Sequence, residues 1–128
     1  MHKKLSETEM LIMTELWAIG KPISVKELAE WLLIRKKIDW KVQTISTFLV
    51  RMEQKGYIHD RKSGKAKLYY PAFSSEEIQS IEAKGLLENH YDGSFKKFLV
   101  ALSSGKISDE EADKLERWLI EQKEEKIE

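Results

Sequence analysis

Apolar residues recur at helical spacing in several stretches of the chain, and the most informative stretch runs from Trp40 to Gly56. One face of this predicted helix carries Val42, Ile45, Phe48, Leu49 and Met52. The opposite face carries Gln43, Thr44, Thr47, Arg51 and Gln54, with Ser46 and Val50 at its edges. Thr and Ser are mediocre helix formers, so stability alone does not explain this polar face. Hydroxyls and amides suit a DNA groove, although the segment by itself fits an ordinary amphipathic helix equally well.

Two helices are predicted ahead of this one. Each begins at a capping box, in which a Ser and a Glu three residues later satisfy open backbone N–H groups: Ser6 with Glu9, and Ser24 with Glu27. The apolar stripe of the first is Met10, Ile12, Met13, Leu16 and Trp17, and that of the second is Val25, Leu28, Ala29, Leu32 and Leu33. Gly20 ends the first helix, and the basic run Arg35–Asp39 is expected to be the turn after the second.

After Gly56 the apolar period changes from about 3.6 to about 2, which predicts strands. We expect one strand at Tyr57–Arg61, another at Ala66–Tyr70, and a basic hairpin tip at Lys62–Lys65. Three helices followed by a two-stranded hairpin are the order of a winged helix-turn-helix. The expected fold is therefore mainly α with a small β-hairpin wing, and residues 1–73 form the DNA-binding domain.

Residues 74–128 are predicted to form three more helices, which begin after Ser74, Ser94 and Ser108. Three short helices of this length cannot bury a stable core alone. A DNA reader usually needs two half-sites, so we expect this region to be a helical dimerisation domain. The residues expected at the dimer contact are Ile78, Ile81, Leu86, Phe95, Phe98, Leu99, Leu115, Trp118 and Leu119.

Composition adds a division of charge to this picture. The chain has 128 residues and no net charge. Residues 1–73 hold 14 Lys and Arg against 8 Asp and Glu, giving +6, whereas residues 74–128 hold 8 against 14, giving −6. A basic half beside an acidic half favours a polyanion-binding module joined to a part that does not bind the polyanion, although chance is the alternative. No signal-peptide or membrane-length apolar run is present, so we expect a cytoplasmic protein.

Catalytic and metal-binding chemistry is not indicated. There is no cysteine, and the histidines His2, His59 and His90 have no ligand-like spacing. The acidic run Asp109–Glu111 fits the N-terminus of a helix, where the dipole favours negative charge. With no phosphate-binding glycine loop and no nucleophile–base pair, we expect neither an enzyme nor a cofactor.

Basic residues bracket the weakly charged face of the Trp40–Gly56 helix. They are Arg35, Lys36, Lys37, Lys41, Arg51, Lys55, Lys62, Lys65 and Lys67. The residues predicted to contact DNA are Lys41, Gln43, Thr44, Ser46, Thr47, Arg51, Lys62, Lys65 and Lys67. The competing interpretation is a winged helix that serves as a protein-interaction scaffold and does not bind DNA.

Four stretches of the chain resemble the penicillinase-repressor family, also called BlaI/MecI/CopY. They are Trp40 with Thr44–Met52, Lys55–Ile58, Leu68–Pro71 and Tyr91–Ser94. The resemblance covers nearly the whole chain, from Leu5 to the last helix. It implies a homodimeric repressor that binds a palindromic double-stranded DNA operator. It also implies that Thr44 and Thr47 reach the major groove and that Arg51 lies towards the backbone.

Three departures from the family pattern limit what the resemblance implies. Copper-responsive members carry a C-terminal cysteine cluster, which this chain lacks. Members that respond to β-lactams are cleaved at an Asn-Phe bond, whereas the corresponding pair here is Ala101-Leu102. A membrane sensor protease is therefore a partner of the family that this chain does not itself indicate. Gln43 also replaces a lysine that is common early in the recognition helix, so a different operator is expected.

Overall fold

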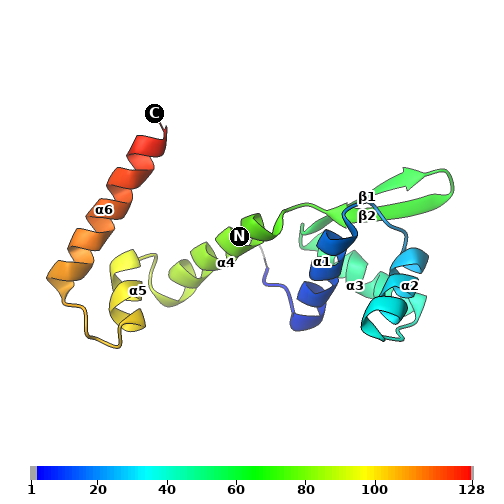
Figure 1. Cartoon of the computed structure of the whole chain (residues 1–128), viewed down its shortest axis with the longest axis horizontal. Coiled ribbons are helices and arrows are strands. Elements are labelled where there is room, and N and C mark those ends of the chain that lie inside the picture. Colours follow the sequence, from blue (N-terminus) through cyan, green and yellow to red (C-terminus); the bar gives the residue numbers. More distant parts are fainter. Residues whose placement is uncertain (1–2, 128) are drawn as a thin grey trace. The chain divides into compact units, whose positions relative to one another are not determined.

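The computed structural model describes residues 3–127, which form six helices and one hairpin. Figure 1 shows these elements along the chain. The elements in order are α1 (Glu7–Ile19), α2 (Val25–Lys36), α3 (Val42–Gln54), β1 (Ile58–Ser63), β2 (Ala66–Pro71), α4 (Ser75–His90), α5 (Phe95–Leu102) and α6 (Asp109–Ile127). This confirms the mainly helical fold with a hairpin wing. The chain divides into two compact units, which meet inside α4 between Ile81 and Glu82.

The helix starts agree with the sequence prediction because they are set by local hydrogen bonds. At α1, the Glu9 N–H donates to Ser6 Oγ over 3.1 Å, and the Ser6 N–H donates to Glu9 Oε1 over 2.8 Å. Such reciprocal bonds satisfy N–H groups that the first helical turn leaves open. The same pairs of bonds are made by Ser24 with Glu27, Ser74 with Glu77, and Ser108 with Glu111.

The end of α2 differs from the prediction. The sequence predicts a turn from Arg35, but the helix continues through Lys36 and turns at Lys37, which has φ +56°. Positive charge in the last turn is compatible with the negative end of the helix dipole, so these cations do not break the helix. The Lys37 N–H donates to the Leu33 carbonyl over 3.1 Å and closes that end.

The hairpin is longer and tighter than predicted. Ser63 pairs with Ala66, so its tip has the two residues Gly64 and Lys65, instead of the four of Lys62–Lys65. Gly64 has φ +63°, which a two-residue hairpin turn requires and a glycine adopts without strain. Ile23 adds a short bridge to Tyr69 through bonds of 3.0 and 2.8 Å. The hairpin is thereby fixed to the segment between α1 and α2.

The first unit has one hydrophobic core, to which all its helices and the hairpin contribute. Its fully buried members include Ile12, Met13, Leu16, Leu28, Leu32, Ile45, Leu49, Met52 and Ile58. Two residues assigned to apolar stripes lie outside it. Val42 is 46% exposed, since it lies in the first turn of α3, one turn before the first buried position. Leu33 is also exposed, because Leu28 and Leu32 define the inward side of α2.

The second unit is held together mainly by contacts between side chains that remain partly exposed. Among its described residues, Ala112 is the one buried apolar residue. Phe98 contacts Tyr91 and Phe95, with ring centroids 5.5 and 6.4 Å apart. Lys96 joins α5 to α6 through an ion pair of 3.2 Å with Asp113. The unit therefore contains little core of its own, as the sequence predicts for this region.

Gly85 offers a test of the local energetics. α4 is continuous through this glycine, and an added Cβ would meet only the Asn89 amide at 4.0 Å. Gly85→Ala should therefore stabilise the protein by about 0.5–1 kcal/mol in urea denaturation, because alanine loses less backbone freedom on folding. Gly64→Ala is the matched control, and it should destabilise because alanine strains at a positive φ. A loss of stability in Gly85→Ala would show that this position is packed.

Candidate nucleic-acid interface

One side of α3 is held firmly by the core. Ile45, Leu49 and Met52 are fully buried at helical spacing and set the rotation of the helix about its axis. At the entry to the helix, the rings of Trp40 and Phe48 lie 5.9 Å apart, and both pack against the core. The opposite side of α3 is thereby presented to solvent in a fixed register.

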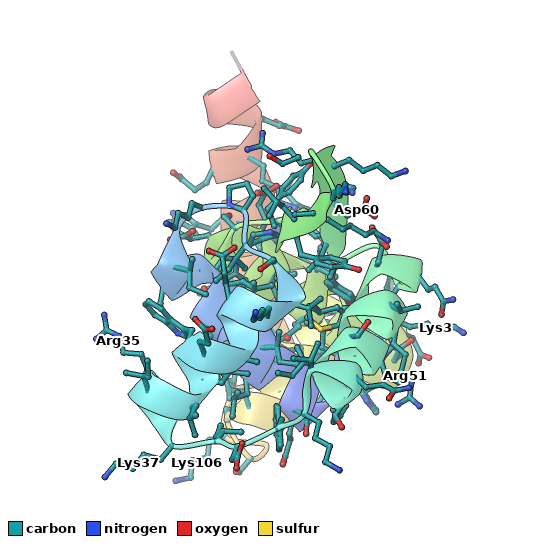
Figure 2. The ribbon with its side chains drawn as sticks, turned by 90° about the vertical axis from the view of Figure 1, so that its right-hand side faces the viewer. Lys3, Arg35, Lys37, Arg51, Asp60 and Lys106 are labelled. Carbon is teal, nitrogen blue, oxygen red and sulfur yellow. The ribbon has the colours of Figure 1, made fainter. Side chains whose placement is uncertain are left out.

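The exposed side of α3 carries most of the residues predicted to contact DNA. Gln43, Thr44, Thr47 and Arg51 are all exposed, whereas Ser46 at the edge is half-buried. The Thr47 hydroxyl donates to the Gln43 carbonyl over 3.0 Å, so its oxygen remains available as an acceptor. Arg51 projects outward from α3 in Figure 2. Lys41 is the exposed N-cap residue, and its side chain makes no capping hydrogen bond.

The C-terminal end of α3 is fixed by a buried ion pair that the sequence pattern does not reveal. Lys55 Nζ lies 2.6 Å from Glu9 Oε1, and Glu9 is only 2% exposed. Burial raises the pKa of Glu9, but hydrogen bonds from Lys55 and Ser6 outweigh it and leave the pKa below its ordinary value. The sequence groups Lys55 with the basic residues that bracket the polar face of α3. Its ammonium joins α3 to α1, because a positive charge beside the buried Glu9 carboxylate stabilises that carboxylate in its ionised form.

The same contacts hold the N-terminal segment beside α3. Lys55 Nζ also donates to the Lys4 carbonyl over 3.3 Å, and Tyr57 Oη donates to the Lys3 carbonyl over 2.7 Å. Lys3 and Lys4 are exposed, and Lys3 is labelled in Figure 2. Two cations that the sequence does not assign to the site are thus placed near the end of α3. Their position depends on contacts more than 50 residues apart in the chain, which no local pattern reveals.

In the wing, the predicted lysines divide into two kinds. Lys62 and Lys65 are exposed, as is Arg61, which had not been assigned to the site. Lys67 is exposed too, but it lies 3.6 Å from Asp60 and 4.0 Å from Glu53, and its ammonium is over the Tyr69 ring. Much of its charge is therefore compensated within the chain.

Glu53 and Asp60 lie together where α3 meets the wing. A side-chain hydrogen bond with Asp60 raises the pKa of Glu53, and burial adds to the effect. The same hydrogen bond lowers the pKa of Asp60, so the two carboxyls differ in how readily they ionise. Asp60 is labelled on the hairpin in Figure 2. With Lys67 beside them, these acids form a local ion-pair cluster at the base of the wing.

Two basic residues at the end of α2 also have partners within the chain. The Arg35 guanidinium lies 4.7 Å from the centroid of the Trp31 ring, and Lys36 is 3.6 Å from Glu15. Lys37 is exposed, and Figure 2 shows Arg35 and Lys37 projecting outward. Glu15 also accepts a hydrogen bond of 3.0 Å from Trp31 Nε1, which ties α2 to α1.

The residues predicted for a dimer contact have different environments. Ile78 is only 2% exposed and belongs to the core of the first unit, so it packs within the chain and does not face a partner. Ile81, Phe95, Phe98, Leu99 and Leu119 are half-buried, whereas Leu86, Leu115 and Trp118 are exposed. The pair Ala101-Leu102 lies in the last turn of α5, and both residues are exposed.

In the first unit, α3 has one buried row of apolar residues and an exposed polar face, and the paired hairpin of β1 and β2 follows it. These features define the first unit as a winged helix-turn-helix. Comparison with protein-family models matches residues 5–121 to the penicillinase repressor family. The chain belongs to this family of transcriptional repressors. The confirmed membership agrees with the resemblance found in the sequence.

Two solved structures are similar to part of the chain. The DNA-binding domain of the repressor BlaI has 28% identity and a TM-score of 0.50, over 60% of this chain and 93% of that one. The Bacillus licheniformis BlaI monomeric form in complex with the blaP half-operator has 26% identity and a TM-score of 0.49, over 60% and 90%. No curated protein matches the sequence.

The part of the chain that the structure describes holds neither a metal site nor a membrane-spanning helix. No group of three or more His, Asp or Glu side chains there is placed to hold a metal ion. No helix among those residues is long and apolar enough to cross a membrane.

Proposed function

We propose that the protein is a homodimeric transcriptional repressor that binds a palindromic operator, with α3 in the major groove and the wing on the DNA backbone. The observation that carries the proposal is the division of α3 into two sides. Its core side is fully buried, while its outer side presents hydroxyls, amides and Arg51. A helix held rigidly with such a face is suited to contact base edges.

The cations around α3 support the same orientation. Lys41 lies at its start, Arg51 along it, and Lys62 and Lys65 on the wing, and all four are exposed. Contacts of lysine and arginine with phosphate position a protein on DNA, whereas the residues that reach bases provide specificity. Thr44 and Thr47 lie between these cations on the exposed surface. We assign them to base contacts and the lysines to the backbone.

Apolar side chains of the second unit support a homodimer. Leu115 and Trp118 of α6 are 43% and 57% exposed, and Leu86 and Leu102 are exposed as well. Residues of this kind are costly to leave in water, and a second copy of the chain provides a matching surface. Two linked copies present two α3 helices, which suits two half-sites of a palindrome. We propose residues 74–128 as the dimerisation domain, with Ile78 excluded from the contact.

A salt titration tests the proposal and separates it from the scaffold interpretation. The affinity of the full chain for duplex DNA should fall steeply with salt, since phosphate contacts release counterions. Lys65→Ala should lower the slope of log affinity against log salt by about one for each wing that contacts a phosphate. Lys114→Ala, which removes an exposed charge from α6, is the control and should leave the slope unchanged. A weak slope in the unaltered protein would favour the scaffold.

A further inference from the structure

Val50 is an apolar residue on the solvent side of α3. It is 41% exposed and contributes nothing to the set of buried residues that hold the helix. A β-branched residue on an exposed helix surface has lower helix propensity than Ala, Glu or Lys. Stability of the helix therefore gives no reason for valine at this position, and an explanation has to come from what the exposed side contacts.

The helical spacing places Val50 among the residues assigned to DNA. Gln43, Thr47, Val50 and Gln54 stand at i, i+4, i+7 and i+11, so they form one exposed row along α3. Val42, the other exposed valine of this helix, is three residues before Ile45 and seven before Leu49. It therefore borders the buried side and lies outside this row. The chain thus offers two exposed valines on one helix in different positions.

Thr47 adds a methyl group beside Val50. Its hydroxyl donates to the Gln43 carbonyl, which turns the oxygen towards the helix backbone. The hydroxyl has thereby used its one proton, its oxygen can still accept a hydrogen bond, and the γ-methyl is the apolar part of the side chain. Thr47 and Val50 are three residues apart on one side of the helix, so their methyl groups make an apolar patch within a polar row.

In the major groove, the feature that suits an apolar patch is the C5 methyl of thymine. It is the one apolar group that base pairs display there, and aliphatic side chains contact it. We infer that Val50, together with the methyl of Thr47, reads a thymine methyl and so determines part of the operator sequence. The inference rests on the proposed function, and it extends the reading residues from hydrogen-bonding groups to an aliphatic one.

The test begins with a binding site obtained from the protein itself. Duplexes bound by the full chain are selected from a random library, and each thymine of the enriched site is replaced in turn by deoxyuridine. This change removes the methyl and leaves base pairing intact. At one thymine in each half-site, the unaltered protein should lose about three- to fivefold in affinity, the effect of removing one methyl from an apolar contact.

The variants decide whether Val50 makes that contact. Val50→Ala should bind duplexes with thymine or deoxyuridine at that position with equal affinity. The effect of removing the thymine methyl then depends on Val50, and a double-mutant cycle measures this dependence. Val42→Ala is the matched control and should keep the full loss. If Val50→Ala remains as sensitive as the unaltered protein at every thymine, or if no thymine is sensitive, the inference is wrong while DNA binding stands. Failure to enrich any sequence, with no salt dependence, would overturn the proposed function and the inference with it.

Discussion

Replacing Leu115 and Trp118 together with Asp should convert the protein to a monomer and lower its affinity for a two-half-site operator by a factor of about 10² to 10⁴. Both side chains are exposed in the chain alone, so the double variant loses no core contact. Carboxylates in an apolar contact between two copies would lose hydration without gaining a partner. Once the copies separate, each winged unit binds alone, and the gain from linking two units disappears.

Sedimentation and operator titration together check this expectation. Arg117→Asp introduces the same side chain at an exposed position of α6 and should leave a dimer that binds normally. Circular dichroism should show the same helix content in both proteins. A double variant that still sediments as a dimer would remove Leu115 and Trp118 from the contact. A monomer that binds the operator as tightly as before would contradict the role of linked half-sites.

Cleavage after α5 offers an independent route to the same state. Residues 103–108 join α5 to α6, and Gly105 within them has φ +78°. A protease site inserted there would let α6 be separated from the winged unit in otherwise intact protein. We expect cleavage to abolish tight operator binding while the first unit keeps its fold. Undiminished affinity after complete cleavage would mean that α6 is dispensable for dimerisation.

The second large effect is expected at the buried ion pair between α1 and α3. Lys55→Met should destabilise the first unit by about 3–5 kcal/mol, since it leaves the Glu9 carboxylate buried without its counter-charge. Glu9 Oε2 has no hydrogen-bond partner among the described residues. The hydrogen bonds of this carboxylate are therefore the ones that Oε1 accepts from Lys55 and Ser6. Urea denaturation followed by circular dichroism measures the loss.

The pH dependence of stability follows from the same pair. The pKa of Glu9 in the folded chain lies below its ordinary value of 4.5. The stabilisation is therefore present above about pH 4.5 and is lost as the pH falls through the lower, folded value. Comparing Glu9→Gln with the unaltered protein at neutral and acidic pH should show a difference that shrinks on acidification.

A double variant distinguishes the pair from simple loss of packing. Glu9→Gln combined with Lys55→Met removes both charges, so it should be more stable than Lys55→Met alone. Additive losses in the two single variants would show that the residues act independently. Because the pair fixes the end of α3, the single Lys55→Met variant should also bind operator less tightly under conditions where it remains folded.

Local chemistry explains which parts of the fold were predictable from the sequence. The capping boxes at Ser6 and Ser24 act within one turn, so the starts of α1 and α2 could be read directly. The polar side of α3 was equally clear, because periodicity decides which residues share a face. By contrast, the tip of the wing depends on strand register, and register requires knowing that Ser63 pairs with Ala66.

The sequence could not show which lysines are available to DNA. Lys55 pairs with Glu9, 46 residues away, and Lys67 pairs with Asp60 across the hairpin. Periodicity identifies them as polar positions near the end of a helix or on a strand, but their partners depend on the tertiary fold. Ile78 was misassigned for a similar reason. It lies in the part of α4 that belongs to the first unit, and the apolar stripe of α4 does not reveal where that unit ends.

The division of α3 into a buried and an exposed side has a consequence for how such a repressor can diverge. Ile45, Leu49 and Met52 maintain the fold, while Gln43, Thr44 and Val50 are exposed. Substitutions at exposed positions away from special contacts usually change stability by no more than about 0.5 kcal/mol. After gene duplication, a copy could therefore acquire a new target sequence through these outer positions while remaining folded. The two copies would then control different genes with one shared scaffold.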